Sequence, residues 1–189
     1  MAIVSKIMTY LKAANMRFRG KCITLLLRSM GCKVGKGLRA AGWPVFRLYP
    51  SGNFTLGHNF TLGKDVTFEI PEGAILRIGN NVFLSDRVVL STLTKITLGD
   101  YVSIAENTGI RGSFHQLSAH ELAVKQPSDS APIHIGRGVG IGANSTILMG
   151  VHLPEGAIVG ANSVLSKSVT YEVNGIYAGV PAKLLRYRR

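Results

Sequence analysis

The sequence has few charged residues, few cysteines and no long hydrophobic run, and each shortage narrows the class of protein. Of its 189 residues, 17% are charged and 46% are hydrophobic, while 22 are glycine. The apolar fraction excludes a disordered chain, because its burial can offset the entropy lost on folding. The glycine content disfavours a helical bundle, because glycine is a weak helix former. A chain of this length is expected to form one domain with a sizeable core.

The missing hydrophobic run and the sparse cysteines bear on the cellular compartment. The apolar run Cys22–Leu27 is interrupted by Thr24 and is far shorter than the ~20 residues of a bilayer-spanning helix. No small-residue cleavage site follows the basic N-terminal stretch, so we expect no signal peptide. Cys22 and Cys32 form no metal-like cluster, which favours a reducing cytoplasm.

Acidic residues are missing from the first third of the chain. Residues 1–64 contain eleven Lys and Arg and no Asp or Glu, although the net charge of the whole chain is +12. Residues 65–182 carry a net charge of −3 and residues 183–189 one of +4. Aromatic residues are not interleaved with the cations, so nucleic acid is not an expected partner. Cations at the two chain ends favour an anionic membrane surface or an anionic ligand instead.

A six-residue repeat dominates the rest of the sequence. Aliphatic residues occupy every sixth position from Ile135 to Leu165. Runs with the same step precede it at Leu56–Phe68, Ile78–Leu90 and Leu98–Ile110. This period is neither that of a helix nor that of an alternating strand, and a β-sandwich would not keep one phase over so many steps. It suits coils of three short strands with small residues or Asn at the corners, and therefore predicts a parallel β-helix.

The repeat is interrupted between Ile110 and Ile135, where the inward aliphatic residues are missing. We expect an extruded loop over residues 113–132, of about twenty residues, and long loops in compact folds are usually functional. His115 lies at its beginning.

Residues 3–30 are expected to form a helix. Its apolar residues recur at steps of three and four, with Lys6, Arg17 and Arg28 on the opposite side. The apolar positions are Val4, Ile7, Met8, Leu11, Ala14, Phe18, Cys22 and Leu25. Two roles remain open: a cap on the first coil or a basic amphipathic helix on an anionic bilayer. The chain thus divides into a basic helical arm (1–32), a β-helix (33–170) and a basic C-terminal segment (171–189).

The repeats up to Leu165, followed by Ala178-Gly179-Val180-Pro181-Ala182-Lys183, resemble the hexapeptide-repeat acyltransferases, and most closely their sugar O-acetyltransferase branch. The resemblance implies an all-β fold, a left-handed parallel β-helix, preceded here by the amphipathic helix. It also implies acetyl-CoA as cosubstrate, no metal, a homotrimer, and a sugar or glycan-precursor acceptor in cell-envelope polysaccharide biosynthesis.

The same resemblance assigns the catalytic residues. His115 matches the general base, and a neutral imidazole is suited to take the proton of a hydroxyl at pH 7. Ala143 matches the corner whose backbone N–H supports the oxyanion. Ser85 stands where the family has an Asn that holds the acceptor, which is a departure from the small-sugar enzymes. Gly140 replaces a usual Trp, which implies a differently shaped groove near the cofactor.

The resemblance also suggests where coenzyme A would bind. The small corners at Ala143 and Ala161 leave a groove for the pantetheine arm. Ser166 and Lys167 match a Thr-Lys pair after the last repeat, and Lys183 and Arg186 match basic positions of the C-terminal segment. These cations would meet the phosphates of the cofactor.

Several alternatives remain open. The same base would serve an N-acyltransferase acting on an amino sugar, or a xenobiotic acetyltransferase. A non-catalytic scaffold or membrane-binding module is favoured by Ser85 and Gly140. His115 and His120 have the ligand spacing of the gamma-class carbonic anhydrases, but residues 76–92 contain no third His, and zinc catalysis needs three protein ligands. We expect a cytoplasmic protein, with peripheral membrane contact through residues 1–30 as an option.

Overall fold

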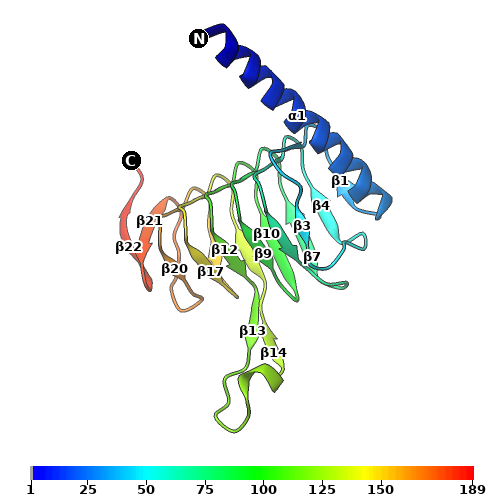
Figure 1. Cartoon of the computed structure of the whole chain (residues 1–189). Helices are drawn as coiled ribbons and strands as arrows, with labels where there is room; N and C mark the ends of the chain where they lie inside the picture. The colour runs from blue at the N-terminus through cyan, green and yellow to red at the C-terminus, as the bar shows by residue number, and fades with distance from the viewer. Residues whose placement is uncertain (1) are drawn as a thin grey trace.

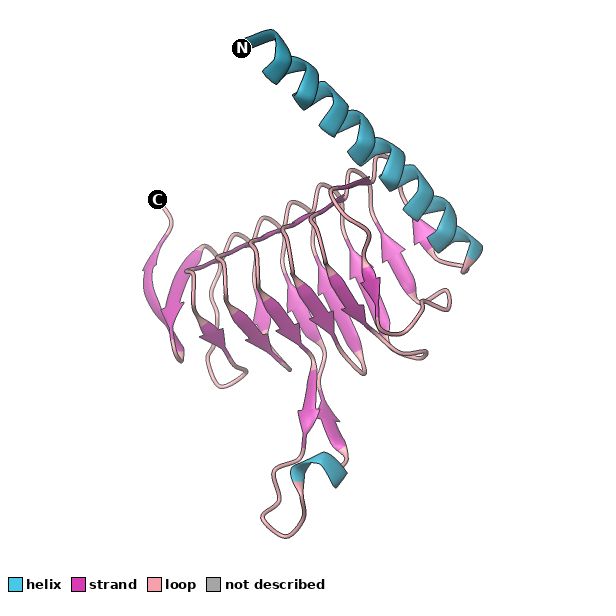
Figure 2. Cartoon of the chain, in the orientation of Figure 1, coloured by secondary structure: helices cyan, strands magenta, loops and turns pink. Residues whose placement is uncertain are grey.

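The chain winds through the same three strand positions coil after coil, and in the computed structural model, which describes residues 2–189, this builds a three-sided prism (Figures 1 and 2). Each side is one parallel sheet, and we call the sheets A, B and C in the order in which the chain meets them. Sheet A consists of β1 (Lys33–Val34), β4 (Phe54–Leu56), β7 (Ile75–Ile78), β10 (Lys95–Leu98), β15 (Ile133–Ile135) and β18 (His152–Leu153). The predicted parallel β-helix is confirmed.

Sheets B and C complete the prism. Sheet B consists of β2 (Arg39–Ala40), β5 (Thr61–Leu62), β8 (Phe83–Leu84), β11 (Ser103–Ile104), β16 (Gly140–Ile141), β19 (Ile158–Val159), β21 (Gly175–Gly179) and β22 (Ala182–Tyr187). Sheet C consists of β3 (Val45–Phe46), β6 (Thr67–Glu69), β9 (Val89–Ser91), β12 (Gly109–Arg111), β17 (Thr146–Leu148) and β20 (Val164–Leu165). The C-terminal segment therefore extends sheet B, with β22 running antiparallel to β21.

The aliphatic residues of the repeat fill the inside of the prism. Ile135, Ile141, Ile147 and Leu153 are all buried, as the six-residue period predicts. The register pairs Thr55 with Arg77 but His134 with His152, so a coil takes 22 residues near the N-terminus and 18 near the C-terminus. The extra residues lie at the corner between sheets C and A, which explains why the repeat loses its phase there.

The extruded loop leaves this same corner between sheets C and A. It forms a hairpin of β13 (Ser113–His115) and β14 (Ser128–Ser130), with a 3-10 turn, η1 (Ala123–Lys125), near its tip. The hairpin projects from the middle of the prism (Figure 1). The hairpin lies within the range 113–132 that the sequence predicted for the loop.

The helix α1 (Ala2–Ser29) begins and ends one residue earlier than predicted. It ends in a Schellman motif, in which Gly31 at a φ of 79° donates to the Arg28 carbonyl and Cys32 donates to the Leu27 carbonyl. Only its C-terminal half lies against the first coil, through buried Gly20, Ile23 and Leu27. Within residues 2–189, no helix combines the length and the apolar character needed to cross a bilayer.

The apolar residues predicted to form one face of this helix are not the residues that cap the coil. Val4, Leu11 and Phe18 are exposed, whereas Ile23 and Leu27, on the opposite side, are buried. The helix thus has two apolar sides, of which the sequence pattern identified the one that stays in solvent.

Gly20 sits where the helix comes closest to the first coil. A Cβ atom at this position would overlap with the Leu38 carbonyl. We predict that Gly20→Ala destabilises the protein by about 1–3 kcal/mol through overpacking, although alanine favours an isolated helix by about 1 kcal/mol. Denaturant unfolding measures the change, with Ala14→Gly at an exposed helix position as the reference for propensity alone. A stabilised Gly20→Ala variant would contradict the close packing.

Two histidines stack on the outward side of sheet A. The ring centroids of His134 and His152 are 4.6 Å apart. Partial burial, and then the nearby His152 and Lys95, lower the pKa of His134 from its ordinary value of 6.5. The folded protein therefore resists protonation of His134, and the unfolded chain does not.

This shift gives the stability a defined pH dependence. Because the unfolded state binds more protons at His134, the free energy of unfolding falls as the pH drops through 6.5 toward the lower folded pKa. We predict that His134→Gln flattens the fall of Tm between about pH 8 and about pH 5. Lys33→Gln is the matched control, because Lys33 also faces outward from sheet A but lies on its first strand, at the far end from His134. An unchanged slope in His134→Gln would refute the assignment.

Candidate functional site

His115 is held on the hairpin in one orientation. Its Nδ1 lies 3.1 Å from the carbonyl oxygen of Gln126. A carbonyl oxygen only accepts hydrogen bonds, so Nδ1 carries the proton and Nε2 carries the free lone pair. The side chain is exposed, and its Nε2 is therefore available to a substrate as a base.

Gln126 organises the loop that carries this carbonyl. Its side chain is buried, with 5% exposed. Its Oε1 accepts from the Ser118 N–H at 2.7 Å, and its Nε2 donates to the carbonyls of Ser118 and Glu121 at 2.8 and 2.7 Å. These bonds fold the loop back on itself and fix the acceptor of the His115 Nδ1 proton. Nothing in the sequence marks Gln126 except its place in a long loop.

A second feature lies at the corner between sheets B and C. Here Ala143 and Ala161 occupy equivalent positions in successive coils, and the Asn162 N–H donates to the Ala143 carbonyl at 2.8 Å. In an earlier coil the corresponding amide is capped, because the Lys64 N–H donates to the Asp86 carboxylate, one coil further on, at 2.7 Å.

The Ala143 amide has no such cap. The residue one coil further on is Ala161, whose methyl group accepts no hydrogen bond. In the part of the chain that the structure describes, the Ala143 N–H meets no acceptor. The amides of Asp86, Glu106 and Ala161, at equivalent positions of the same corner, are likewise without an acceptor among the described residues; an unpaired amide is what an oxyanion site requires.

Ser85 and Lys183 lie along the same edge as Ala143. Ser85 is half-buried at the corner two coils before it, and its N–H donates to the Ile104 carbonyl at 2.9 Å. Lys183 pairs with Ala178 across β21 and β22. Ala178 in turn lies next to Gly160 of the preceding coil. The edge between sheets B and C therefore carries four predicted residues, Ser85, Ala143, Ala161 and Lys183.

The other predicted cofactor residues lie elsewhere. Ser166 and Lys167 follow β20 at the corner between sheets C and A, where Lys167 packs over Gly150 near the base of the hairpin. The Ser166 hydroxyl is engaged with Ser168 at 2.7 Å. Arg186 pairs with Ile176, further along sheet B than Lys183. One chain thus does not assemble Lys167 and Arg186 into a common phosphate site.

His115 and Ala143 are also separated within one chain. The hairpin with His115 leaves the corner between sheets C and A, whereas Ala143 lies at the corner between sheets B and C. One chain therefore does not bring the predicted base and the predicted amide donor together.

The remaining histidines are accounted for by backbone contacts or exposure. His58 Nδ1 accepts from the Lys36 N–H at 3.1 Å, a structural role like that of Asp86. His120 is exposed on the hairpin. Across residues 2–189, no three His, Cys, Asp or Glu side chains are grouped so that they could hold a metal ion.

Comparisons with known proteins agree with this architecture. The profile of the family described as "Hexapeptide repeat of succinyl-transferase" matches residues 132–167. The chain is 30% identical to the dTDP-4-amino-4,6-dideoxy-D-glucose acyltransferase of Escherichia coli over 86% of its own length and 85% of the relative. It is 29% identical to WbbJ of Escherichia coli (strain K12), a suspected O-acetyl transferase of lipopolysaccharide biosynthesis, over 71% and 72% of the two chains.

A solved structure shares the fold. AntD, an N-acyltransferase from Bacillus cereus solved in complex with dTDP and 3-hydroxybutyryl-CoA, superposes with a TM-score of 0.74 over 88% of each chain, at 20% identity. The repeats and the three-sided prism agree with the relative that matches over most of both chains. This chain is therefore an acyltransferase that belongs to the hexapeptide-repeat family, with its left-handed parallel β-helix.

Proposed function

We propose that the protein transfers an acetyl group from acetyl-CoA to a sugar hydroxyl during the synthesis of a cell-envelope polysaccharide. The observation that carries this proposal is the orientation of His115. Its Nδ1 proton is held by the Gln126 carbonyl at 3.1 Å, so Nε2 of the neutral imidazole is the nitrogen left to act as a base. A hydroxyl is a poor nucleophile until such a base removes its proton.

The reaction balances with the groups of this chain. The hydroxyl oxygen attacks the thioester carbon while His115 Nε2 takes the hydroxyl proton. The oxyanion that forms accepts a hydrogen bond from the Ala143 amide. Collapse of this intermediate breaks the carbon–sulfur bond, and the coenzyme A thiolate leaves and regains the proton from His115. The products are an acetyl ester and free coenzyme A.

This mechanism needs a second copy of the chain, because one chain keeps His115 and Ala143 at different corners, and we propose that the copies form a homotrimer. Packing one edge of a prism against the hairpin of the next chain would bring the two residues together. Threefold symmetry would close this head-to-tail contact and give three equal sites. The acyl-CoA would lie along the edge formed by Ala143 and Ala161, with Lys183 at its end.

The acceptor has two candidate classes. WbbJ supports a hydroxyl of an envelope glycan. The acyltransferase of dTDP-4-amino-4,6-dideoxy-D-glucose, matched over 86% of the chain, favours the amino group of a nucleotide-linked sugar as the second candidate. Hydroxylamine or mild alkali separates the two, because it cleaves an acetyl ester and leaves an amide intact.

We predict that His115→Gln lowers kcat/KM about 10²–10⁴-fold, the usual contribution of general-base catalysis. Release of the coenzyme A thiol measures the rate with each acceptor class. Since His115 is exposed, the Tm should not change. His120→Gln, on the same hairpin, is the control and should retain activity. Full activity of His115→Gln would rule out its role as the base.

A second variant tests the uncapped amide. In Ala161→Asp, the new carboxylate should reach the Ala143 N–H as Asp86 reaches the amide of Lys64. We predict a fall in kcat of about 10²–10³-fold, as for the loss of one oxyanion donor, with the fold retained. Asn162→Asp adds the same charge one residue further on and serves as the control. Equal rates for the two variants would argue against the amide as a catalytic donor.

A further inference from the structure

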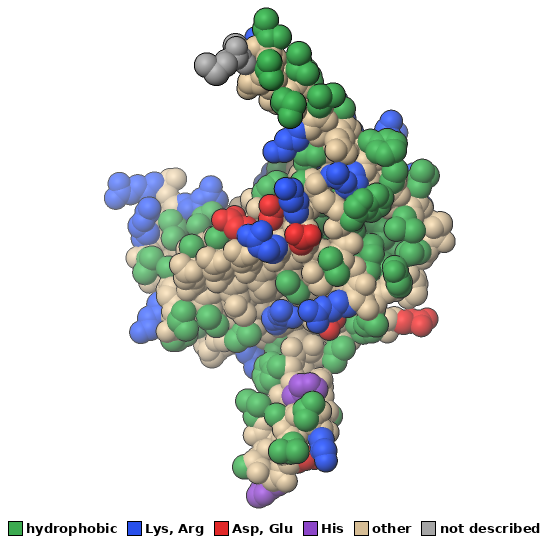
Figure 3. Space-filling model, in the orientation of Figure 1, with side chains coloured by type: hydrophobic (Ala, Val, Ile, Leu, Met, Phe, Trp, Pro, Cys, Tyr) green, Lys and Arg blue, Asp and Glu red, His purple; other side chains and the backbone are tan. Residues whose placement is uncertain are grey.

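The first half of α1 extends beyond the prism, and its described apolar side chains are exposed. Figure 1 shows the helix leaving the first coil, and Figure 3 shows apolar side chains along its free end. Along the whole of α1, seven apolar side chains on one side of the helix are each more than half exposed. We call this set the apolar stripe: Ile3, Val4, Ile7, Met8, Leu11, Phe18 and Leu25.

The stripe lies opposite the side that caps the coil. On the capping side, the side chains of Ile23 and Leu27 are buried. With 3.6 residues per turn, the stripe residues fall on the other side of the helix. Contact with the prism therefore does not explain them. An uncovered apolar face with cations beside it is a feature of helices that lie at a bilayer interface.

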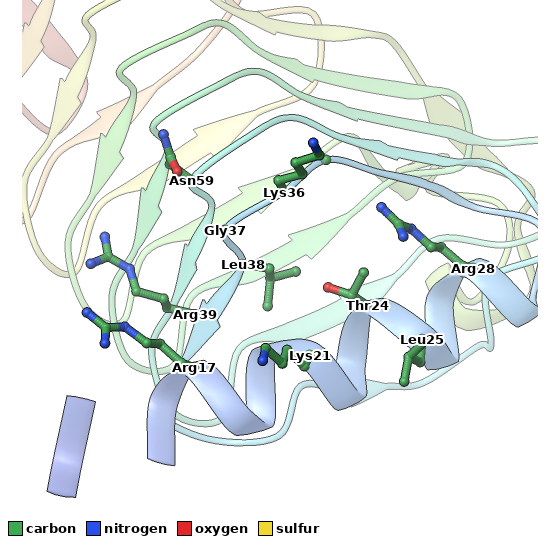
Figure 4. A pocket seen from close by; sticks show the side chains of 11 residues that line it. Arg17, Lys21, Thr24, Leu25, Arg28, Lys36, Gly37, Leu38, Arg39 and Asn59 are labelled. Atoms are coloured by element: carbon green, nitrogen blue, oxygen red, sulfur yellow. The ribbon is translucent and has the colours of Figure 1, made fainter. Parts of the chain in front are cut away.

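Beside the stripe, a pocket of about 680 Å³ opens between α1 and the first coil. Five of its lining residues are cations and none is acidic; the cations are Arg17, Lys21, Arg28, Lys36 and Arg39. In Figure 4, Arg17 and Arg39 lie toward one end of the pocket, and Arg28 lies on the other side of Leu38. Leu25 belongs both to the pocket lining and to the stripe, so the two surfaces are continuous.

The charge of the pocket is not neutralised by the protein. Arg28 donates to the Val34 carbonyl at 2.6 Å and Arg39 to the Thr61 hydroxyl at 3.3 Å, and both acceptors are neutral. For residues 2–189, the ion pairs are Arg47–Glu69, Arg111–Glu69 and Arg137–Glu155, and none involves the pocket. Five clustered cations without a carboxylate favour a ligand with negative charge.

We propose that α1 and the first coil form a docking site for an anionic phospholipid bilayer, in which the pocket binds a headgroup phosphate and the apolar stripe enters the acyl boundary. The continuity of the two surfaces through Leu25 matches a lipid, which is apolar next to its phosphate. A second copy of the chain fits less well, because residues 1–64 contain no acid and two such surfaces would repel. This surface is separate from the hairpin and corner proposed for acetyl transfer.

Flotation of the purified full chain with vesicles tests the proposal. The vesicles contain phosphatidylcholine alone, or phosphatidylcholine and phosphatidylglycerol in equal parts. We predict binding to the anionic vesicles, weaker binding at high salt because of screening, and little binding to the neutral ones. Equal binding to both compositions would overturn the role of the pocket.

Matched variants separate the two parts of the site. Lys21→Gln with Lys36→Gln should lower the partition coefficient about 30-fold, since each cation near an anionic surface contributes about 1 kcal/mol. Arg77→Gln with Lys95→Gln removes the same charge from sheet A and should change binding much less. Leu11→Ser with Phe18→Ser should abolish binding, whereas Leu117→Ser with Val124→Ser, exposed on the hairpin, should not.

Three further outcomes would overturn the proposal. Pocket and stripe variants that bind vesicles as the unaltered chain does would remove both surfaces from the interaction. A lower oligomeric state of Leu11→Ser with Phe18→Ser in sedimentation would show that a second copy covers the stripe. A thermal shift with pyrophosphate that depends on Lys21 and Lys36, without vesicle binding, would assign the pocket to a soluble phosphate compound.

Discussion

The structure depends on the parallel register of its coils. Each coil places inward apolar residues on its three sheets, and strands of one coil donate backbone hydrogen bonds to the carbonyls of the next coil. Short strands of two to four residues cannot persist alone, so each coil relies on its neighbours for both hydrogen bonds and burial. The register also decides which residue stands over each corner amide, and this makes the uncapped amide of Ala143 a consequence of the fold.

The corners show how the chain turns within this register. Asn59, Asn81, Asn107, Asn144 and Asn162 all have a φ between 56° and 58°, a conformation that Asn tolerates better than most residues. The Asn59 side chain donates to that of Asn81 at 3.0 Å, so the corners are also linked from coil to coil. Fixed corners hold Ala143 and Ala161 in line, while the third corner is free to lengthen into the hairpin.

Much of this fold could be predicted from the sequence, because a period of six has few structural solutions. The inward positions Ile135 and Leu165 and the boundaries of the extruded loop follow directly from that period. The capping side of α1 did not, because Ile23 and Leu27 are only two residues and the longer apolar stripe obscures them. The role of Gln126 depends on three contacts within a loop, which no periodicity records. The separation of His115 from Ala143 was equally out of reach, since it requires knowledge of which corner each residue occupies.

The antiparallel strand β22 has a consequence for how the molecule ends. A stack of parallel coils is open at both ends, and an open sheet edge invites another chain to add its strands and grow into a fibre. At one end α1 covers the first coil. At the other end β22 reverses direction and presents Lys183 and Arg186 along the edge of sheet B, where their charges repel a second copy. Both ends of the stack therefore disfavour the addition of further strands, although the stack is built from a unit that could be repeated without end.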